Sequence, residues 1–93
     1  MAEHHRMFVG GEWIEAASGG TFTVSDPATG EVIADVADGG PAEVTRAIEA
    51  AHRAFPSWAA MPPKDRAPIL HRVQSLMEAH REELAHLVMR ENG

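Results

Sequence analysis

The sequence predicts an α+β fold in which an N-terminal β-hairpin and short strands are followed by two helices. Two observations support this prediction. The apolar pattern changes near Gly39-Gly40, from short β-prone runs to residues that recur every three or four positions, as in amphipathic helices. Glycine and proline residues separate the β-prone runs and indicate turns between them. We therefore expect a strand-rich first part and a helical second part that share one core.

The first predicted element is a hairpin. Met7-Phe8-Val9 and Glu12-Trp13-Ile14 are β-prone runs, and Gly10-Gly11 between them can supply the positive φ angles of a tight two-residue turn. Residues 1–6 precede the hairpin and include the pair His4-His5. Because these residues show no apolar pattern, we expect them to form a disordered leader.

Two further strands are predicted before the helices. Residues 21–25 place Phe22 and Val24 on one face and hydroxyl side chains on the other, which is typical of a half-buried strand. Residues 26–30 then predict a chain reversal, because the proline fixes φ and the glycine accepts a left-handed conformation. The run over residues 31–36 is the strongest strand prediction.

The first helix is predicted to begin at Pro41, because a proline at the first helical position removes only an N–H that lacks a partner. Glu43 lies in that first turn, where its charge faces the positive end of the helix dipole. The face of this helix that turns toward the core is formed by Val44, Ile48, Ala51 and Phe55. We expect the helix to end at Pro56 and Trp58 to lie in the following linker.

The second helix is predicted to begin between residues 63 and 65 and to continue to about Asn92. Its apolar stripe is formed by Ile69, Val73, Leu76, Leu84 and Leu87, and is widened by Leu70, Met77 and Val88. Pro68 removes one hydrogen bond of the helix, so we expect the helix either to begin late or to bend there. Gly93 is a suitable left-handed cap for its C-terminal end.

Composition excludes several classes of site. The chain of 93 residues contains no cysteine, which excludes a disulfide framework, a thiolate metal site and a cysteine nucleophile in these residues. Fourteen acidic and eight basic residues give a formal charge of −6, so we expect no nucleic-acid partner. The sequence contains no apolar segment of a signal peptide and no run of eighteen apolar residues. We therefore expect a cytoplasmic protein that does not enter the membrane.

Histidines and acidic residues of the second helix form the only metal-like pattern. Glu83 and His86 have the i, i+3 spacing found in di-iron helical bundles, but such bundles need a second copy of the motif and two further glutamates. Glu82 and Glu83 are adjacent on the helix and diverge by about 100°, so they cannot act as an acid–base pair. We interpret this stretch as an exposed helix surface, and keep a metal site of His80, Glu83 and His86 as the alternative.

Two other features of the sequence are candidate ligand sites. Gly39-Gly40-Pro41 opens a helix after a strand, where backbone N–H groups can bind an anion. Asp38 and Glu43 flank this position and would repel an anion, so we do not predict phosphate binding. Trp13 and Trp58 are interpreted as anchors of a core or interface. The residues alone therefore predict no catalytic, cofactor-binding or metal site.

Five motifs, taken in order, resemble the N-terminal region of the aldehyde dehydrogenase superfamily. They are Phe8–Ile14, Asp26–Ile33, Ala47–Phe55 together with Trp58, Arg66–Leu70 and Glu91–Gly93. The resemblance covers nearly the whole chain from Met7 onward. It implies that residues 7–93 form an incomplete, N-terminal part of the dinucleotide-binding domain in an aldehyde dehydrogenase-like α/β fold. Asp26, where the family more often has asparagine, and Pro68 depart from its pattern.

The resemblance implies that the parent protein is an oxidoreductase that converts an aldehyde or semialdehyde to a carboxylic acid with NAD or NADP. In this family a cysteine attacks the aldehyde, a glutamate activates water and an asparagine holds the oxyanion. None of these residues can be assigned to a position of this chain, and Asn92 belongs to a helix-end motif. We therefore expect the 93 residues alone to be inert and to bind no cofactor.

The same resemblance implies the partners of the chain. The remainder of an aldehyde dehydrogenase, or another protein, would cover the helix faces, and the parent would be a homo-oligomer. A stand-alone interaction module derived from such a segment is the alternative, because the stripe of the second helix is wider than a small sheet can cover.

Overall fold

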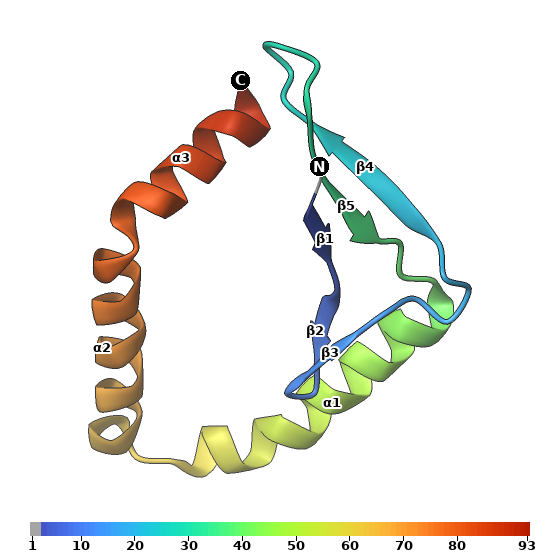
Figure 1. Cartoon of the computed structure of the whole chain (residues 1–93). Coiled ribbons are helices and arrows are strands. Elements are labelled where there is room, and N and C mark those ends of the chain that lie inside the picture. Colours follow the sequence, from blue (N-terminus) through green and yellow to red (C-terminus); the bar gives the residue numbers. More distant parts are fainter. Residues whose placement is uncertain (1–2) are drawn as a thin grey trace.

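The computed structural model describes residues 3–93, in which five strands precede three helices (Figure 1). The strands are β1 (Glu3–His5), β2 (Met7–Val9), β3 (Glu12–Ile14), β4 (Thr21–Ser25) and β5 (Val32–Ala37). The helices are α1 (Pro41–Ala60), α2 (Pro63–Ala79) and α3 (Arg81–Asn92). The predicted order of strands and then helices is confirmed, whereas the predicted number of two helices is wrong.

The strands form two separate sheets. A three-stranded sheet has the order β1-β5-β4, in which β1 pairs parallel and β4 antiparallel with the central strand β5. The sequence had predicted a disordered leader over residues 1–6, and this prediction is wrong for residues 3–5, which form β1. Residues 1–2 lie outside the described residues. The prediction was wrong because β1 is ordered by the edge of β5, and not by an apolar pattern of its own.

The predicted hairpin is confirmed as the second sheet, in which β2 and β3 pair antiparallel. Gly10 and Gly11 have φ angles of 59° and 83°, which only glycine adopts readily and which a two-residue turn of this kind requires. Phe8 lies directly opposite Trp13, and their ring centroids are 4.9 Å apart. The aromatic pair therefore stabilises the register that the turn sets.

The turn between β4 and β5 also follows its prediction. The side chain of Asp26 accepts a hydrogen bond from the Ala28 N–H at 2.8 Å, and its carbonyl accepts one from the Gly30 N–H at 2.8 Å. Gly30 has a positive φ of 76°, as expected for the residue that ends the turn. Aspartate thus closes this turn with its side chain and its backbone, so the departure from the family's asparagine costs no turn contact.

Helix α1 begins at Pro41 as predicted but does not end at Pro56. It continues to Ala60, so Trp58 lies within the helix and not in a linker. A proline inside a helix removes one hydrogen bond and leaves the carbonyl four residues earlier without a partner. Residues 51–56 are exposed, so water can hydrate the freed carbonyl of His52, which makes the proline tolerable.

The predicted second helix is two helices. Helix α2 begins at Pro63 and contains Pro68, so it does not begin late. It ends at Ala79, and His80 lies between the two helices. The His80 N–H donates to the carbonyls of Leu76 and Met77, at 3.1 and 3.2 Å, and the His80 carbonyl accepts from the Leu84 N–H at 2.9 Å. Gly93 has a positive φ of 75° and caps α3, as predicted.

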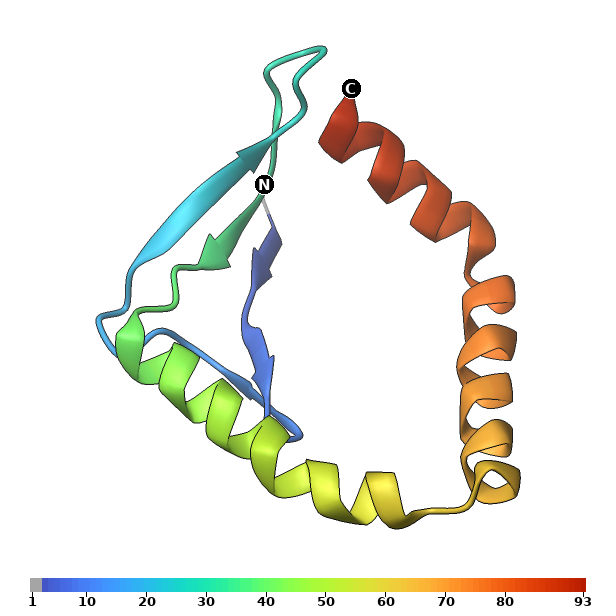
Figure 2. The ribbon, with the colours of Figure 1, turned by 180° about the vertical axis from the view of Figure 1, so that it is seen from behind.

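The elements form an open arc with a small core. The radius of gyration is 16.7 Å, whereas a compact domain of this length has a radius of about 12 Å. Figures 1 and 2 show α2 standing apart from the sheets, and the end of α3 returning to the turn between β4 and β5. The buried apolar residues among positions 3–93 are Val9, Ala16, Ala34 and Ala37. The expected core shared by strands and helices is therefore not formed within the chain.

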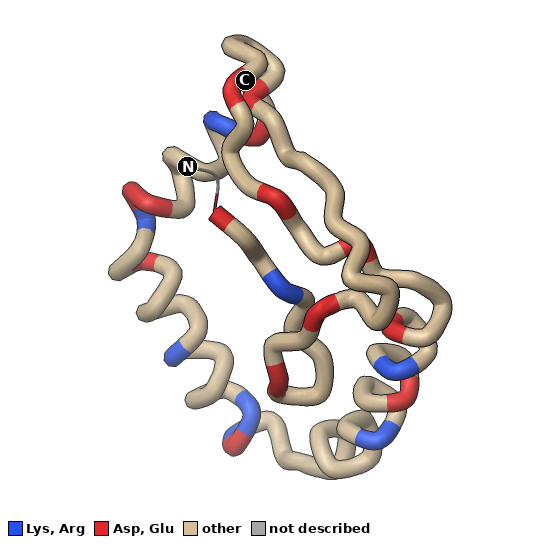
Figure 3. Tube along the Cα trace, turned by 45° about the vertical axis from the view of Figure 1, so that its right-hand side comes forward, with Lys and Arg blue, Asp and Glu red and all other residues tan. Residues whose placement is uncertain are grey.

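Charged residues are spread along the chain rather than gathered on one face. Figure 3 shows single Lys and Arg residues at intervals on the helices and near the N-terminal strands, with Asp and Glu between them. None of the helices within residues 3–93 has the length and apolar character needed to span a bilayer.

Candidate functional site

The most prominent feature of the surface is its apolar character along the helices. Large hydrophobic side chains of α1 are widely exposed; Ile48 has 63% and Phe55 65% of its surface accessible. The stripe predicted for the second helix is exposed as well, and includes Ile69, Val73, Leu76, Leu84, Leu87 and Val88. A monomeric protein rarely exposes contiguous apolar surface of this extent. These faces are therefore the parts of the chain best suited to contact other polypeptide.

An apolar hollow lies where α2 meets α3. It is lined by Val73, Leu76, Met77, His80, Glu83 and Leu84. His80 Nδ1 is 3.0 Å from the Glu83 carboxylate, and both side chains are more than half exposed. His80 thus lies at the helix break and next to the stripe, and it is not packed in a core.

The residues of the alternative metal site do not come together as a ligand set. Glu83 contacts His80, and no group of three or more histidine, aspartate or glutamate side chains within residues 3–93 has an arrangement that could hold a metal ion. Glu82 and Glu83 are successive residues in the first turn of α3. The stretch therefore presents charged side chains to solvent, as the exposed-surface interpretation describes.

The N-terminus of α1 is occupied by a carboxylate of the chain itself. Glu43 lies in the first turn of α1 and is buried, with 7% of its surface exposed, although its side chain is acidic. Its Oε2 accepts a hydrogen bond from the Gly40 N–H at 2.9 Å, and its Oε1 accepts one from the Ala17 N–H. The Gly40 N–H, which the Gly39-Gly40-Pro41 pattern offered to an anion, is thus engaged by Glu43.

These backbone hydrogen bonds determine the charge state of Glu43. The N–H groups of Ala17, of Glu43 itself and of Gly40 hold the pKa of this carboxyl below its ordinary value of 4.5. Glu43 is therefore ionised at neutral pH and joins the loop after β3 to the start of α1. The sequence indicated a favourable charge in the helix, but the contact with Ala17 was missed because it spans 26 residues.

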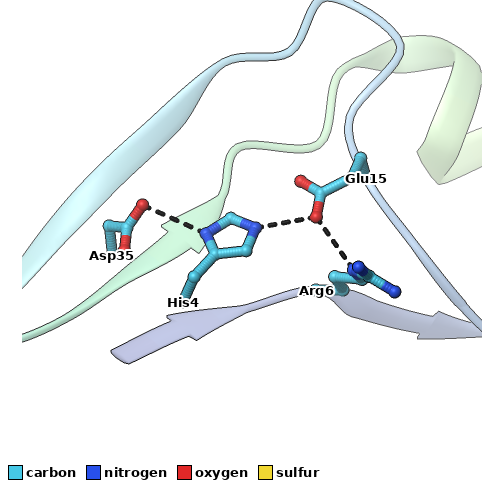
Figure 4. Close-up of polar contacts among 4 residues, drawn as sticks. All are labelled: His4, Arg6, Glu15 and Asp35. Carbon is cyan, nitrogen blue, oxygen red and sulfur yellow. Dashed lines mark hydrogen bonds and ion pairs between the residues drawn. The ribbon is translucent and has the colours of Figure 1, made fainter. Parts of the chain in front are cut away.

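A second polar cluster surrounds His4 (Figure 4). Its Nδ1 is 3.0 Å from Asp35 Oδ2 on β5, and its Nε2 is 2.7 Å from Glu15 Oε1 just after β3. The Nε of Arg6 donates to the same Glu15 oxygen at 3.0 Å. Sequence reasoning missed this cluster, since no local pattern links His4 to partners 11 and 31 residues away. The cluster connects three segments and brings together no nucleophile.

The two tryptophans have different environments. Trp13 packs against Phe8 with the two ring planes tilted by 52°, and it remains 64% exposed. Trp58 on α1 is 37% exposed. Trp13 lines a shallow hollow together with His4, His5 and Arg6, and both tryptophans are accessible to solvent. This arrangement agrees with their interpretation as interface anchors more closely than with a role in a core.

Comparison with known proteins identifies the family. The model of the aldehyde dehydrogenase family matches residues 13–93. The chain belongs to the aldehyde dehydrogenase family. The resemblance seen in the five motifs is thereby confirmed.

Curated relatives within the aldehyde dehydrogenase family match nearly all of this chain. A phenylacetaldehyde dehydrogenase from Pseudomonas fluorescens is 44% identical over 91 aligned positions, and the match covers 96% of this chain and 18% of the relative. A glutarate-semialdehyde dehydrogenase from Pseudomonas putida is 45% identical over 86 residues, which are 92% of this chain and 18% of the relative. The chain thus spans less than a fifth of the length of these relatives.

Solved structures confirm that the fold is the N-terminal part of an aldehyde dehydrogenase. The NAD+ complex of an aldehyde dehydrogenase from Bacillus cereus is 40% identical, with a TM-score of 0.91. An NADP-dependent enzyme from E. coli is 37% identical, with a TM-score of 0.92. Each match covers 98% of this chain and 19% of the solved one. The open arc therefore recurs inside much larger proteins.

Proposed function

We propose that the chain is the N-terminal segment of an NAD(P)-dependent aldehyde dehydrogenase and acts as part of its dinucleotide-binding domain. The observation that carries this proposal is that the backbone has the arrangement found in whole enzymes, while the apolar faces of its helices are exposed. Three helices and two sheets are arranged as in whole enzymes, yet their apolar faces contact little within these residues. In the parent enzyme the remaining chain covers these faces.

The parent enzyme oxidises an aldehyde or semialdehyde to a carboxylic acid with NAD or NADP. Two relatives support this proposal, because they are named as dehydrogenases of phenylacetaldehyde and of glutarate semialdehyde. Two similar solved structures also support it, one described as an NAD+ complex and the other as an NADP-dependent enzyme. We place the parent in the cytoplasm as a homo-oligomer. The role of these residues is structural: they hold no nucleophile or cofactor and provide a frame for the rest of the domain.

Activity assays on two proteins test this role. The purified 93 residues should yield no reduced nicotinamide from NAD or NADP with a panel of aldehydes and semialdehydes. The full natural chain that contains them should yield reduced nicotinamide with at least one member of the panel. Turnover by the 93 residues that survives repurification would contradict the structural role. A full natural chain without turnover on the whole panel would contradict the proposed parent activity.

A second candidate is a stand-alone protein-interaction module that uses the same apolar faces. It is favoured by the extent of exposed apolar surface along α1, α2 and α3. In that case the chain would fold independently and present a groove to a partner. The solution behaviour of the isolated chain, discussed below, distinguishes the two.

A further inference from the structure

The His4 imidazole is held between two carboxylates that belong to separate parts of the chain. Asp35 approaches one ring nitrogen from β5, and Glu15 approaches the other from the segment after β3 (Figure 4). His4 itself lies in the middle of β1 and pairs in parallel register with Asp35. One side chain thus connects the N-terminal edge strand to β5 and to the segment that follows β3.

Among residues 3–93, three charged groups surround His4, and each comes from a different place in the chain. Asp35 comes from β5, Glu15 from the segment after β3, and Arg6 from the residue that follows β1. Arg6 contacts Glu15 and not the imidazole. The neighbouring His5 contacts Glu3 at 3.1 Å and lies outside the cluster, so it can be replaced without removing a contact of His4.

The geometry requires a particular protonation state. Carboxylates only accept hydrogen bonds, so both contacts of His4 are hydrogen bonds only when both ring nitrogens carry a proton. A neutral imidazole carries one proton and directs a lone pair at the remaining carboxylate. We propose that His4 is a pH-sensitive clasp that holds β1 to β5 and to the segment after β3 while the imidazole is charged, and loosens β1 when the imidazole becomes neutral.

The titration of the cluster defines the range over which the clasp is closed. The hydrogen bond to Glu15, followed by that to Asp35, raises the pKa of His4 above 6.5. The hydrogen bond from His4 lowers the pKa of Glu15 below 4.5. The stabilisation from His4 is complete below pH 6.5 and disappears as the pH rises through the raised pKa. The stabilisation from Glu15 is complete above pH 4.5 and disappears as the pH falls through its lowered pKa.

The effect is expected to be local. His4, Glu15 and Asp35 each expose 38–45% of their side chains, and solvent weakens ion pairs at such sites. Strand β1, however, has only three residues and lies at the edge of its sheet, so few other contacts oppose its release. Opening of β1 without global unfolding is therefore the process that His4 controls.

Hydrogen exchange on the full natural chain tests the clasp. Hydrogen exchange at the histidine C2 position, measured by mass spectrometry, reports the pKa of an individual imidazole. His4 and His5 fall in the same peptide, so the variant His5→Gln is used to leave His4 as the histidine that this β1 peptide reports. Amide exchange of the same peptide, corrected for the intrinsic effect of pH, reports the opening of β1. In His5→Gln, we expect the His4 midpoint above 6.5 and a several-fold loss of β1 protection across that midpoint.

Two further variants make the outcome decisive. Glu15→Gln in the His5→Gln background should lower the His4 midpoint, because a charged partner is removed. His4→Gln should give weak β1 protection that no longer changes across this pH range. A His4 midpoint at or below 6.5 would overturn the proposal. So would an unchanged pH dependence of β1 protection in His4→Gln, or a β1 that is unprotected at every pH in His5→Gln.

Discussion

The Glu43 carboxylate connects two segments that the sequence separates. It accepts hydrogen bonds from the backbone of Ala17 and of Gly40, and is buried although ionised. Buried charges are tolerated when hydrogen bonds replace the lost hydration, as they do here. A residue of this kind fixes the angle at which the first helix leaves the sheet.

Replacement of Glu43 should loosen both of its attachment points. In Glu43→Gln the negative charge is lost and one acceptor oxygen becomes an NH2 group that cannot accept. Amide exchange of Ala17 and Gly40 in the full natural chain should therefore accelerate several-fold at neutral pH. Glu49→Gln, at an exposed position of the same helix, is the control and should leave both amides unchanged.

The pH dependence of this effect follows from the lowered pKa of Glu43. Its stabilisation is complete above pH 4.5 and is lost as the pH falls through the lower value in the folded protein. The difference in amide protection between the full natural chain without a substitution and its Glu43→Gln variant should thus shrink only at pH values below 4.5. Equal exchange rates at neutral pH would contradict the role assigned to this carboxylate.

Elements whose signal is local could be predicted from the sequence. The Gly10-Gly11 hairpin, the turn closed by Asp26 and Gly30, and the start of α1 at Pro41 each depend on residues within a few positions of one another. Their backbone preferences act before any tertiary contact forms. These predictions succeeded for that reason.

Other elements depend on distant contacts or on solvent. Strand β1 exists because β5 offers an edge, and α1 passes Pro56 within a stretch of exposed residues. The break at His80 carries neither glycine nor proline, so no breaker residue predicts it. A usable signal was the run of six residues from Glu78 to Glu83, which contains no large apolar side chain and interrupts the stripe.

The hairpin turn provides a prediction at the scale of an element. Gly11 has a φ of 83°, and a side chain added there would meet no other atom within 4 Å. Gly11→Val should thus destabilise the hairpin through backbone strain alone, by about 1–2 kcal/mol. Gly11→Asn should cost less, because asparagine adopts positive φ more readily.

Amide exchange of residues 7–14 in the full natural chain measures this cost locally, which avoids the multistate unfolding of a large enzyme. Val and Asn variants with equal protection would show that the turn does not depend on positive φ at this position.

The shape of the whole molecule reflects how little of its apolar surface is covered. Its radius of gyration of 16.7 Å is well above the value of about 12 Å for a compact domain of this length. The chain nevertheless matches solved aldehyde dehydrogenases over 98% of its length. Such an arrangement is stable where other polypeptide fills the arc. The sequence predicted the apolar stripes, but without their partner it could not predict the arc.

Ile48 reports whether its face of α1 is covered. It is 63% exposed within these residues. If the remaining chain covers it, Ile48→Ala in the full natural chain should cost about 2–5 kcal/mol, as at a buried site. A truly exposed site would change stability by less than about 0.5 kcal/mol. Native-state amide exchange of α1 in the full natural chain measures this cost locally. Glu49→Ala, at the neighbouring exposed position, is the control, and equal effects of the two substitutions would indicate that the face stays open.

Light scattering after size-exclusion chromatography, combined with thermal unfolding of the isolated 93 residues, tests the central claim most directly. An incomplete part of an aldehyde dehydrogenase domain should be self-associated or expanded and should unfold without a sharp transition, because its helix faces lack their partner. A compact monomer with a sharp, cooperative thermal transition would contradict this account and would favour the stand-alone interaction module.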